Sequence, residues 1–191
     1  LCSGNNTQPI QYQRTTMGNA FGGGGNKPKE EACILLQRAM EGDLKEVRHL
    51  VEQFQSNNNT DNNDDDASNR KRLFEFVHQA DSQGNNALHG AVFAGQLEIV
   101  QYLIEECGAD PTCTNAMGCD ALWLAAGYDR VEVLEYLLTS KLLNNHDKRK
   151  EALLTTNHSN DSALLAAASR GHLRVCQILL AEISKVCGGD G

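Results

Sequence analysis

The sequence lacks a long apolar run and has few aromatic residues. No stretch of the 191 residues approaches the ~20 consecutive apolar residues that a membrane-spanning helix needs, which argues against a transmembrane segment. Aromatic residues make up 5% of the chain against 40% for all hydrophobic residues, so a core must be built from Ala, Leu, Ile and Val. The first thirty residues are polar and Gly-rich, without the apolar segment of a secretory signal.

Positive charge is also scarce. The chain has 17 Lys and Arg against 25 Asp and Glu, which gives a formal net charge of −8. A nucleic-acid-binding surface needs a concentration of Lys and Arg to meet the phosphates. The composition therefore argues against a nucleic-acid partner.

The cysteines are odd in number and lack the close C-x2–4-C pairs of structural zinc sites. Without a secretory signal, we interpret them as reduced thiols, which indicates a cytoplasmic location, with the nucleus as the alternative. We expect no bound metal. The seven positions are Cys2, Cys33, Cys107, Cys113, Cys119, Cys176 and Cys187.

Sequence motifs for catalysis are missing as well. There is no G-x-S-x-G motif, and the six histidines stand outside any paired catalytic or metal-binding motif. The glycine run 22–25 leads to Lys27 between Asn26 and Pro28, whereas a phosphate-binding loop needs Gly-Lys-Ser/Thr. We therefore expect a protein that is not an enzyme and has no cofactor.

Two segments have the composition of unstructured linkers. Residues 1–25 are rich in Asn, Gln and Gly, which predicts a disordered arm. Residues 56–70 are rich in Asn and Asp, whose like charges and side-chain hydrogen bonding disfavour both helix and strand. This second segment predicts an insertion loop.

The arm contains a weak match to a lipidation signal. Met17-Gly18 begins like an N-myristoylation site, which would place a lipid on Gly18 if translation starts at Met17. The favoured Ser or Thr is replaced by Gly22, and a single acyl chain is only a marginal anchor.

The rest of the chain repeats itself. Segments 34–51, 87–104, 121–138 and 163–180 align, and their starts are separated by 53, 34 and 42 residues. A unit of about 33 residues, lengthened twice by insertions, explains these offsets. Three columns of the alignment are apolar in every unit: Leu35, Leu88, Leu122 and Leu164; Leu44, Leu97, Val131 and Leu173; Leu50, Leu103, Leu137 and Leu179.

Each unit predicts two short helices. The first is Ala-rich and ends at a residue type that tolerates the left-handed conformation, namely Gly42, Gly95, Asp129 or Gly171. The second has apolar residues at helical spacing. Good N-cap residues precede the first helix of the later units at Asn86, Asp120 and Ser162. In the first unit we expect an earlier start, with Asn26 as cap and Pro28 in the first turn.

The second unit carries a specific pattern. Asp81, Gly84, the run Asn86-Ala87-Leu88-His89 and Gly95 resemble the ankyrin repeat family. The resemblance covers about residues 28–190 and implies an all-α solenoid of stacked helix-turn-helix hairpins with short β-hairpin fingers. The implied units lie near 28–54, 81–110, 115–140 and 157–187.

The later units depart from the family at one structural position. Trp123 and Leu165 stand where His89 stands in the second unit. The family's histidine joins neighbouring units by hydrogen bonds, so the resemblance leaves those bonds in doubt for the third and fourth units.

The resemblance implies a non-enzymatic protein–protein interaction module that binds a partner protein on its concave face. The alternative is a targeting or regulatory repeat region of a larger protein, such as an enzyme or a channel. Contact positions in the family flank the finger glycine and precede the glycine that ends the first helix. Carried over, they are Ser82, Gln83, Asn85, Phe93, Ala94, Met117, Cys119, Tyr128, His158, Ser159, Asp161 and Arg170.

The fourth unit is unusually apolar for a terminal one, which should be polar on its outer side. Residues 187–190 also echo residues 107–110, which lead into the third unit. The sequence therefore predicts a further unit, and self-association through residues 163–183 when that unit is absent.

Overall fold

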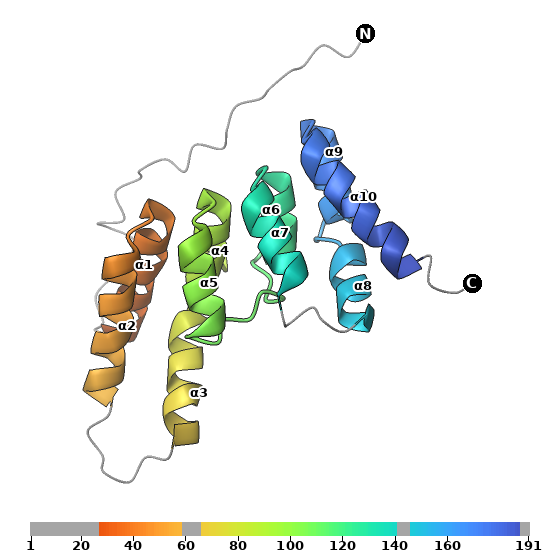
Figure 1. The fold of residues 1–191 in the computed structure, drawn as a ribbon. Coiled ribbons are helices and arrows are strands. Elements are labelled where there is room, and N and C mark those ends of the chain that lie inside the picture. Colours follow the sequence, from red (N-terminus) through yellow and green to blue (C-terminus); the bar gives the residue numbers. More distant parts are fainter. Residues whose placement is uncertain (1–26, 59–65, 141–145, 188–191) are drawn as a thin grey trace.

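A computed structural model describes residues 27–58, 66–140 and 146–187. These residues form a row of stacked helices (Figure 1). The helices are α1 (Lys27–Glu41), α2 (Leu44–Asn58), α3 (Asp66–Val77), α4 (Ala87–Ala94), α5 (Leu97–Glu105), α6 (Ala121–Gly127), α7 (Val131–Thr139), α8 (His146–Leu154), α9 (Ala163–Arg170) and α10 (Leu173–Cys187). The predicted arm at 1–25, including Gly18, and the proposed cap Asn26 lie outside the described residues.

Four helical hairpins build the stack, which confirms the predicted all-α solenoid. They pair α1 with α2, α4 with α5, α6 with α7, and α9 with α10. The first helices pack in the order α1, α4, α6 and α9, and the second helices form another layer beside them, in which α10 is inclined to the others (Figure 1). The described residues contain no strand, and only an isolated bridge joins Thr156 to Ser162, so the fingers are turns rather than β-hairpins.

Small residues on the first helices let neighbouring hairpins approach closely. Ala39, Ala91 and Ala125 are completely buried in the core. A Cβ atom on Gly90 would lie 2.5 Å from the Cδ1 atom of Leu36 and 3.2 Å from its carbonyl oxygen, so a larger residue would displace the Leu36 side chain or move α1 from α4. The Ala-rich composition of the first helices therefore has a packing reason.

The helix boundaries follow the local rules that the sequence indicated. Asn86, Asp120 and Ser162 cap α4, α6 and α9 through side-chain oxygens that accept backbone N–H bonds. Gly42, Gly95 and Gly171 have φ near +80°, and Asp129 has φ +58°. The structure also begins α1 at Lys27, with Pro28 in its first turn.

The prediction of a loop over residues 56–70 is wrong, because both ends of this range are helical. Helix α2 continues to Asn58, and α3 begins at Asp66. The reason is tertiary packing: Phe76 is 1% exposed and stacks on Phe54 of α2, with 4.1 Å between the ring centroids. The polar composition of 56–70 gave no sign of α3, because the apolar residues that hold this helix in place follow residue 70.

A second additional helix, α8, occupies the interruption before the fourth hairpin. Its only fully buried residue is Leu153, and its Arg149 lies 3.3 Å from Glu182 of α10. The connection between α7 and α9 therefore contains a helix, α8, that packs against α9 and α10.

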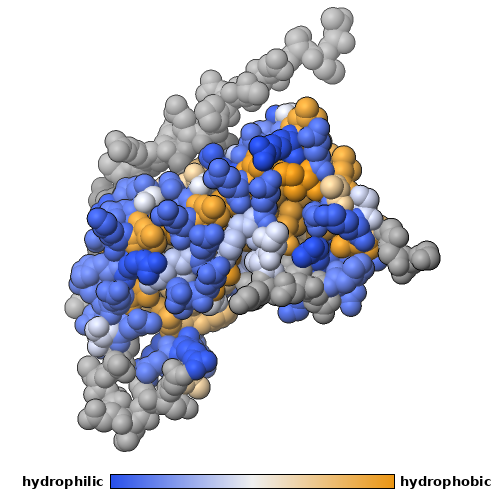
Figure 2. Space-filling model, in the orientation of Figure 1, coloured by the Kyte–Doolittle hydropathy of each residue, from blue (hydrophilic) through white to orange (hydrophobic). Residues whose placement is uncertain are grey.

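The last hairpin exposes leucines. Leu165 is 49% exposed, Leu173 71% and Leu180 53%. Figure 2 shows hydrophobic surface gathered over α9 and α10, beside a mostly hydrophilic face over the earlier hairpins. We call these three residues the leucine patch.

The leucine patch predicts self-association at high protein concentration, because contiguous exposed apolar surface favours contact with another molecule. We expect sedimentation velocity to show concentration-dependent association of the chain. The double variant Leu173→Glu/Leu180→Glu should sediment as a monomer over the same range. A monomeric wild-type chain throughout that range would contradict the prediction.

Candidate protein-interaction surface

The three turns between successive hairpins share one hydrogen-bond pattern. In the first, the Oδ1 atom of Asp81 accepts hydrogen bonds from the backbone N–H groups of Gln83 and Asn85, at 2.9 and 2.8 Å. Asn115 and Asn157 accept the equivalent bonds, two and four residues onward, in the second and third turns. In each turn, which we call a finger, these hydrogen bonds from backbone N–H groups to one side-chain oxygen fix the backbone conformation.

The position three residues after each of these acceptors needs a left-handed backbone. It is Gly84 with φ +75°, Gly118 with φ +76° and Asn160 with φ +60°. Asn is the non-glycine residue that best tolerates this region. Sequence reasoning found Asp81 and Gly84 but missed Asn115, Asn157 and Asn160, although the shared spacing of three residues was the signal.

Each finger is also bonded to the next. The backbone N–H of Ala116 donates to the carbonyl oxygen of Gln83 at 2.9 Å, and that of His158 donates to the carbonyl oxygen of Met117 at 2.9 Å. The fingers approach so closely that a Cβ atom on Gly84 would lie 2.6 Å from the nitrogen of Ala116. The three fingers thus form one continuous ladder.

Two of the predicted contact residues lie inside this ladder, so their assignment to the surface is wrong. Asn85 is 6% exposed and accepts a 2.9 Å hydrogen bond from the side-chain N–H of Asn115. Cys119 is completely buried, and its Sγ atom lies 3.8 Å from Nδ2 of Asn157. Both side chains are occupied by the next finger and are not available to a partner.

The other ten predicted contact residues lie on the molecular surface. Ser82, Gln83, Met117, His158, Ser159 and Arg170 are exposed, and Phe93, Ala94, Tyr128 and Asp161 are partly exposed. Met40 of α1 belongs with them because it occupies the alignment column of Phe93, a correspondence that the repeat alignment contained and our selection missed. We call these eleven residues the finger face.

A hollow of about 170 Å³ lies on the finger face between the first, second and third hairpins. The rings of Phe93 and Tyr128 form one wall, meeting edge to face with their centroids 4.5 Å apart. Met40, Met117 and Leu124 also line it. The polar residues of the lining are Gln83 and the hydrogen-bonded Asn85, His89 and Asn115. The hollow is therefore mainly apolar and aromatic.

Arg170 lies beside this hollow. Its guanidinium carbon is 5.5 Å from the centroid of the Tyr128 ring and 5.2 Å from that of the Trp123 ring. Burial raises the pKa of the Tyr128 hydroxyl, while the nearby Arg170 charge acts in the opposite direction. Tyr128 thus contacts both the apolar hollow and a cation.

Further ties between hairpins fix the first helices under the finger face. The Nε2 atom of His89 lies 3.1 Å from the carbonyl oxygen of Cys113. At the equivalent position Trp123 donates its indole N–H to the carbonyl oxygen of Asp161 at 3.0 Å. The tie that the sequence left in doubt for the third unit is therefore present, because indole also offers a ring N–H donor. Leu165 has no such donor and is 49% exposed.

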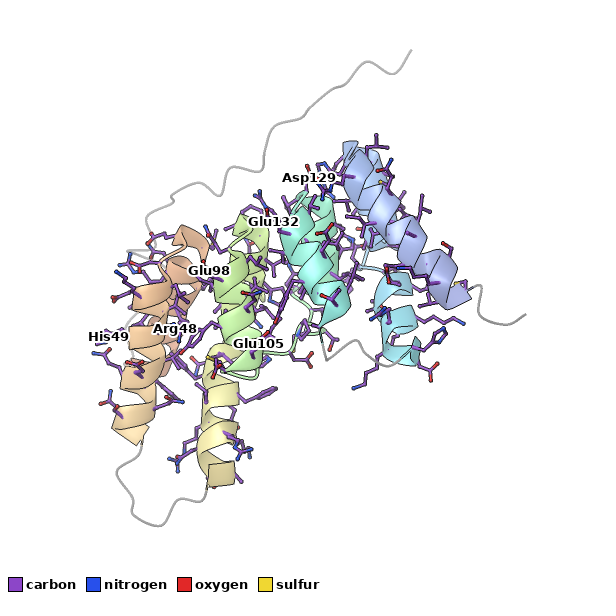
Figure 3. All side chains as sticks on the ribbon, in the orientation of Figure 1. Arg48, His49, Glu98, Glu105, Asp129 and Glu132 are labelled. Atoms are coloured by element: carbon purple, nitrogen blue, oxygen red, sulfur yellow. The ribbon has the colours of Figure 1, made fainter. Side chains whose placement is uncertain are left out.

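The opposite side of the stack, formed by the second helices, has a different character. Three glutamates, Glu98 and Glu105 on α5 and Glu132 on α7, lie on this side (Figure 3), and the Glu105 carboxylate accepts a 2.9 Å hydrogen bond from the Tyr136 hydroxyl. All three side chains are exposed. On the finger face, by contrast, only Asp161 and Arg170 carry a formal charge.

The N-cap of α6 is a buried acid. Asp120 is 7% exposed, and its burial raises the pKa of the carboxyl group from 3.8 to about 6. The corresponding cap of α4 is the neutral Asn86, which is also buried. The folded protein therefore binds the Asp120 proton more tightly than the unfolded chain does. The stabilisation that this proton gives to the folded state is complete below pH 3.8 and is lost as the pH rises through about 6.

We expect Asp120→Asn to raise the free energy of unfolding by about 1–2 kcal/mol at pH 8, because asparagine keeps the cap and removes a buried charge. The gain should vanish at pH 4. Urea denaturation at the two pH values measures the difference. An equal gain at both would show that the charge is not its cause.

The comparisons with known proteins agree with this architecture. The family model described as ankyrin repeats (3 copies) matches residues 22–149 and 88–188. The chain belongs to the ankyrin repeat family. Ankyrin repeats are protein-interaction modules, so the family is consistent with a surface built to contact another protein.

Three curated relatives show the settings in which similar repeats occur. The chain is 29% identical over 118 residues to the human transient receptor potential cation channel subfamily A member 1, covering 62% of the chain and 10% of that protein. It is 35% identical over 103 residues to mouse ankyrin repeat domain-containing protein 63, covering 54% and 25%. It is 30% identical over 166 residues to a probable E3 ubiquitin-protein ligase, XBOS32, from Oryza sativa subsp. japonica, covering 87% and 27%. The chain thus spans 10–27% of the length of these relatives.

In the part of the chain that the structure describes, no His, Cys, Asp and Glu side chains gather in a group of three that would hold a metal ion. Nor does any helix within 27–58, 66–140 and 146–187 have the length and apolar character needed to cross a membrane. The finger face, which carries the hollow, is the candidate interaction site.

Proposed function

We propose that this ankyrin repeat chain binds a partner protein through its finger face and is not itself an enzyme. The observation that carries the proposal is the apolar hollow, which leaves Phe93, Tyr128 and Met117 accessible, with Met117 54% exposed. Aromatic residues, Met and Arg are enriched where protein interfaces bury their central contacts.

The backbone beneath this surface supports the same proposal. The ladder bonds each finger to the next, and Trp123 and His89 tie the first helices to the fingers. A surface held in this way loses little conformational freedom when a partner binds, which favours affinity. The exposed tip side chains then determine which partner fits.

Affinity capture with the whole chain tests the proposal. We expect a specific protein to be retained by the wild type and lost with Met117→Glu and Phe93→Ala. The matched control is Glu98→Lys, which changes an exposed charge on α5 away from the finger face (Figure 3). Circular dichroism of each variant checks that the helices remain. Partners lost with Glu98→Lys but kept by both finger-face variants would refute the proposal.

A second proposal concerns the protein as a whole. The chain spans only part of its relatives, and two of these are named as a cation channel and an E3 ubiquitin-protein ligase. We propose that the repeats serve as the targeting or regulatory region of a larger protein. The complete reading frame tests this directly: an additional catalytic or membrane domain supports it, and a frame that adds none overturns it.

A cytosolic or nuclear location remains a proposal, supported by thiols that are unpaired throughout the described residues. A fluorescent fusion of the complete protein tests the location by microscopy. Lipid attachment at Gly18 is tested in the same cells by labelling with a myristate analogue, with Gly18→Ala as the control.

A further inference from the structure

The hollow on the finger face has the size and lining of a pocket for one side chain. Its volume of about 170 Å³ corresponds to about six water molecules at ~30 Å³ each. Gly90 and the buried Leu124 line it together with the Phe93 and Tyr128 rings. Of the polar residues that line it, Asn85, His89 and Asn115 already hydrogen-bond to protein groups. Water in the hollow therefore has few partners, and an apolar side chain displaces it favourably.

Arg170 supplies a charged neighbour with free hydrogen-bonding capacity. Of its five N–H donors, one is used in a 3.3 Å bond from Nη1 to the carbonyl oxygen of Ala166. Within the described ranges it has no ion pair. A Cβ atom at position 127 would lie 2.9 Å from Nη1, so Gly127 leaves room for the guanidinium above Tyr128 and Trp123. A guanidinium held on aromatic rings is well placed to bind a carboxylate in a bidentate manner.

Tyr128 connects the two features, because it forms a wall of the hollow and lies under Arg170. An extended peptide advances about 3.3–3.6 Å per residue, so two or three residues bridge the hollow and the guanidinium. Resting on the function proposed above, we infer that the finger face binds an extended peptide segment of its partner. One large apolar side chain of this segment fills the hollow, and an Asp or Glu two or three residues away pairs with Arg170.

Charge supports an acidic rather than a basic segment. Within the finger face Arg170 is the only cation and Asp161 the only anion, and it is Arg170 that lies beside Tyr128 and the hollow. A carboxylate is favoured over a phosphate because phosphate recognition in peptides relies on clusters of Arg. Arg170 therefore selects the segment, and the hollow anchors it.

Selection from random twelve-residue peptides displayed on phage tests this inference. The whole chain is the bait, and the double variant Phe93→Ala/Arg170→Glu is used to remove peptides that bind elsewhere. We expect the enriched peptides to share an apolar residue with an Asp or Glu two or three positions away. The strongest is then synthesised and titrated against the chain, with Trp123 fluorescence as the signal, since Trp123 is the only tryptophan and contacts Arg170.

Arg170→Glu should weaken this peptide by about tenfold or more, which corresponds to ~1.4 kcal/mol of binding free energy. A peptide with Lys in place of its acid should regain affinity for Arg170→Glu. Arg174→Glu is the matched control, because Arg174 lies on α10 beside Glu135 and outside the finger face, and it should bind as the wild type does. Arg170→Gln, checked with circular dichroism, provides a second variant if Arg170→Glu alters the fold.

The failures are distinguishable. Enriched peptides that lack an acid, or that bind Arg170→Glu and Arg170→Gln as tightly as the wild type while losing affinity for Phe93→Ala, refute the inference and leave the proposed function standing. The absence of any enriched peptide also refutes the inference alone, because a folded partner remains compatible with the proposed function. A separate selection without the removal step tests both together: if all of its peptides respond to Glu98→Lys and to no finger-face variant, the inference and the proposed function are both refuted.

Discussion

Leu88→Ala and Leu122→Ala should each lower the free energy of unfolding by roughly 2–5 kcal/mol, the usual cost of emptying a buried leucine site. Each side chain is 3% exposed and lies in the first helix of an inner hairpin. Buried alanines such as Ala91 and Ala125 already bring the surrounding helices close together, which limits how far the cavity can collapse. Urea denaturation followed by circular dichroism measures the loss.

The two variants should also differ in how they unfold. In a repeat array each unit contacts only its neighbours, so a weakened inner unit uncouples the units on either side. We expect broadened transitions for both variants. Leu165→Ala is the matched control, because this leucine of α9 is 49% exposed and its truncation should cost less than about 1 kcal/mol. A loss as large as that of Leu122→Ala would show that the assigned burial is wrong.

Phe76→Ala should cost roughly 3–5 kcal/mol. Phe76 is 1% exposed and stacks on Phe54, so its removal releases α3 from α2. The control lies two residues earlier: Phe74 is 44% exposed, and Phe74→Ala should have only a small effect. Thermal denaturation of the two variants provides the comparison. Small effects of equal size, together with immediate amide exchange throughout α3, would show that α3 is not stably packed against α2.

The repeat frame was predictable because its signals are local. An N-cap such as Asn86 and a left-handed glycine such as Gly95 act within a few residues of themselves, and the apolar columns recur at fixed spacing. Helices α3 and α8 were not predictable in this way. Their sequences lack the recurring apolar columns of the repeat units, and buried contacts such as those of Phe76 and Leu153 with other helices stabilise them.

The same distinction between local and distant interactions explains which site residues could be predicted from the sequence. The sequence identified the finger tips and first-helix ends, because these positions recur in every unit. It wrongly included Asn85 and Cys119, whose hydrogen-bond partners come from asparagines 30 and 38 residues further along the chain. It left the role of Trp123 in doubt because a residue-type comparison does not register that indole and imidazole both supply an N–H.

The finger ladder has a consequence for how this protein can evolve. At the tips, the bonds between fingers use only main-chain atoms, with Ala116 and His158 as donors and Gln83 and Met117 as acceptors. The side chains at these four positions can therefore be exchanged without removing a bond of the framework. Proline is the exception at all four positions, since it has no N–H to donate. At Ala116 and His158 it would remove a bond between fingers, and at Gln83 and Met117 it would remove the bond to Asp81 or Asn115 within a finger. Binding specificity can therefore change while the backbone framework stays the same. A library randomised at these tip positions should consist largely of folded molecules with different specificities.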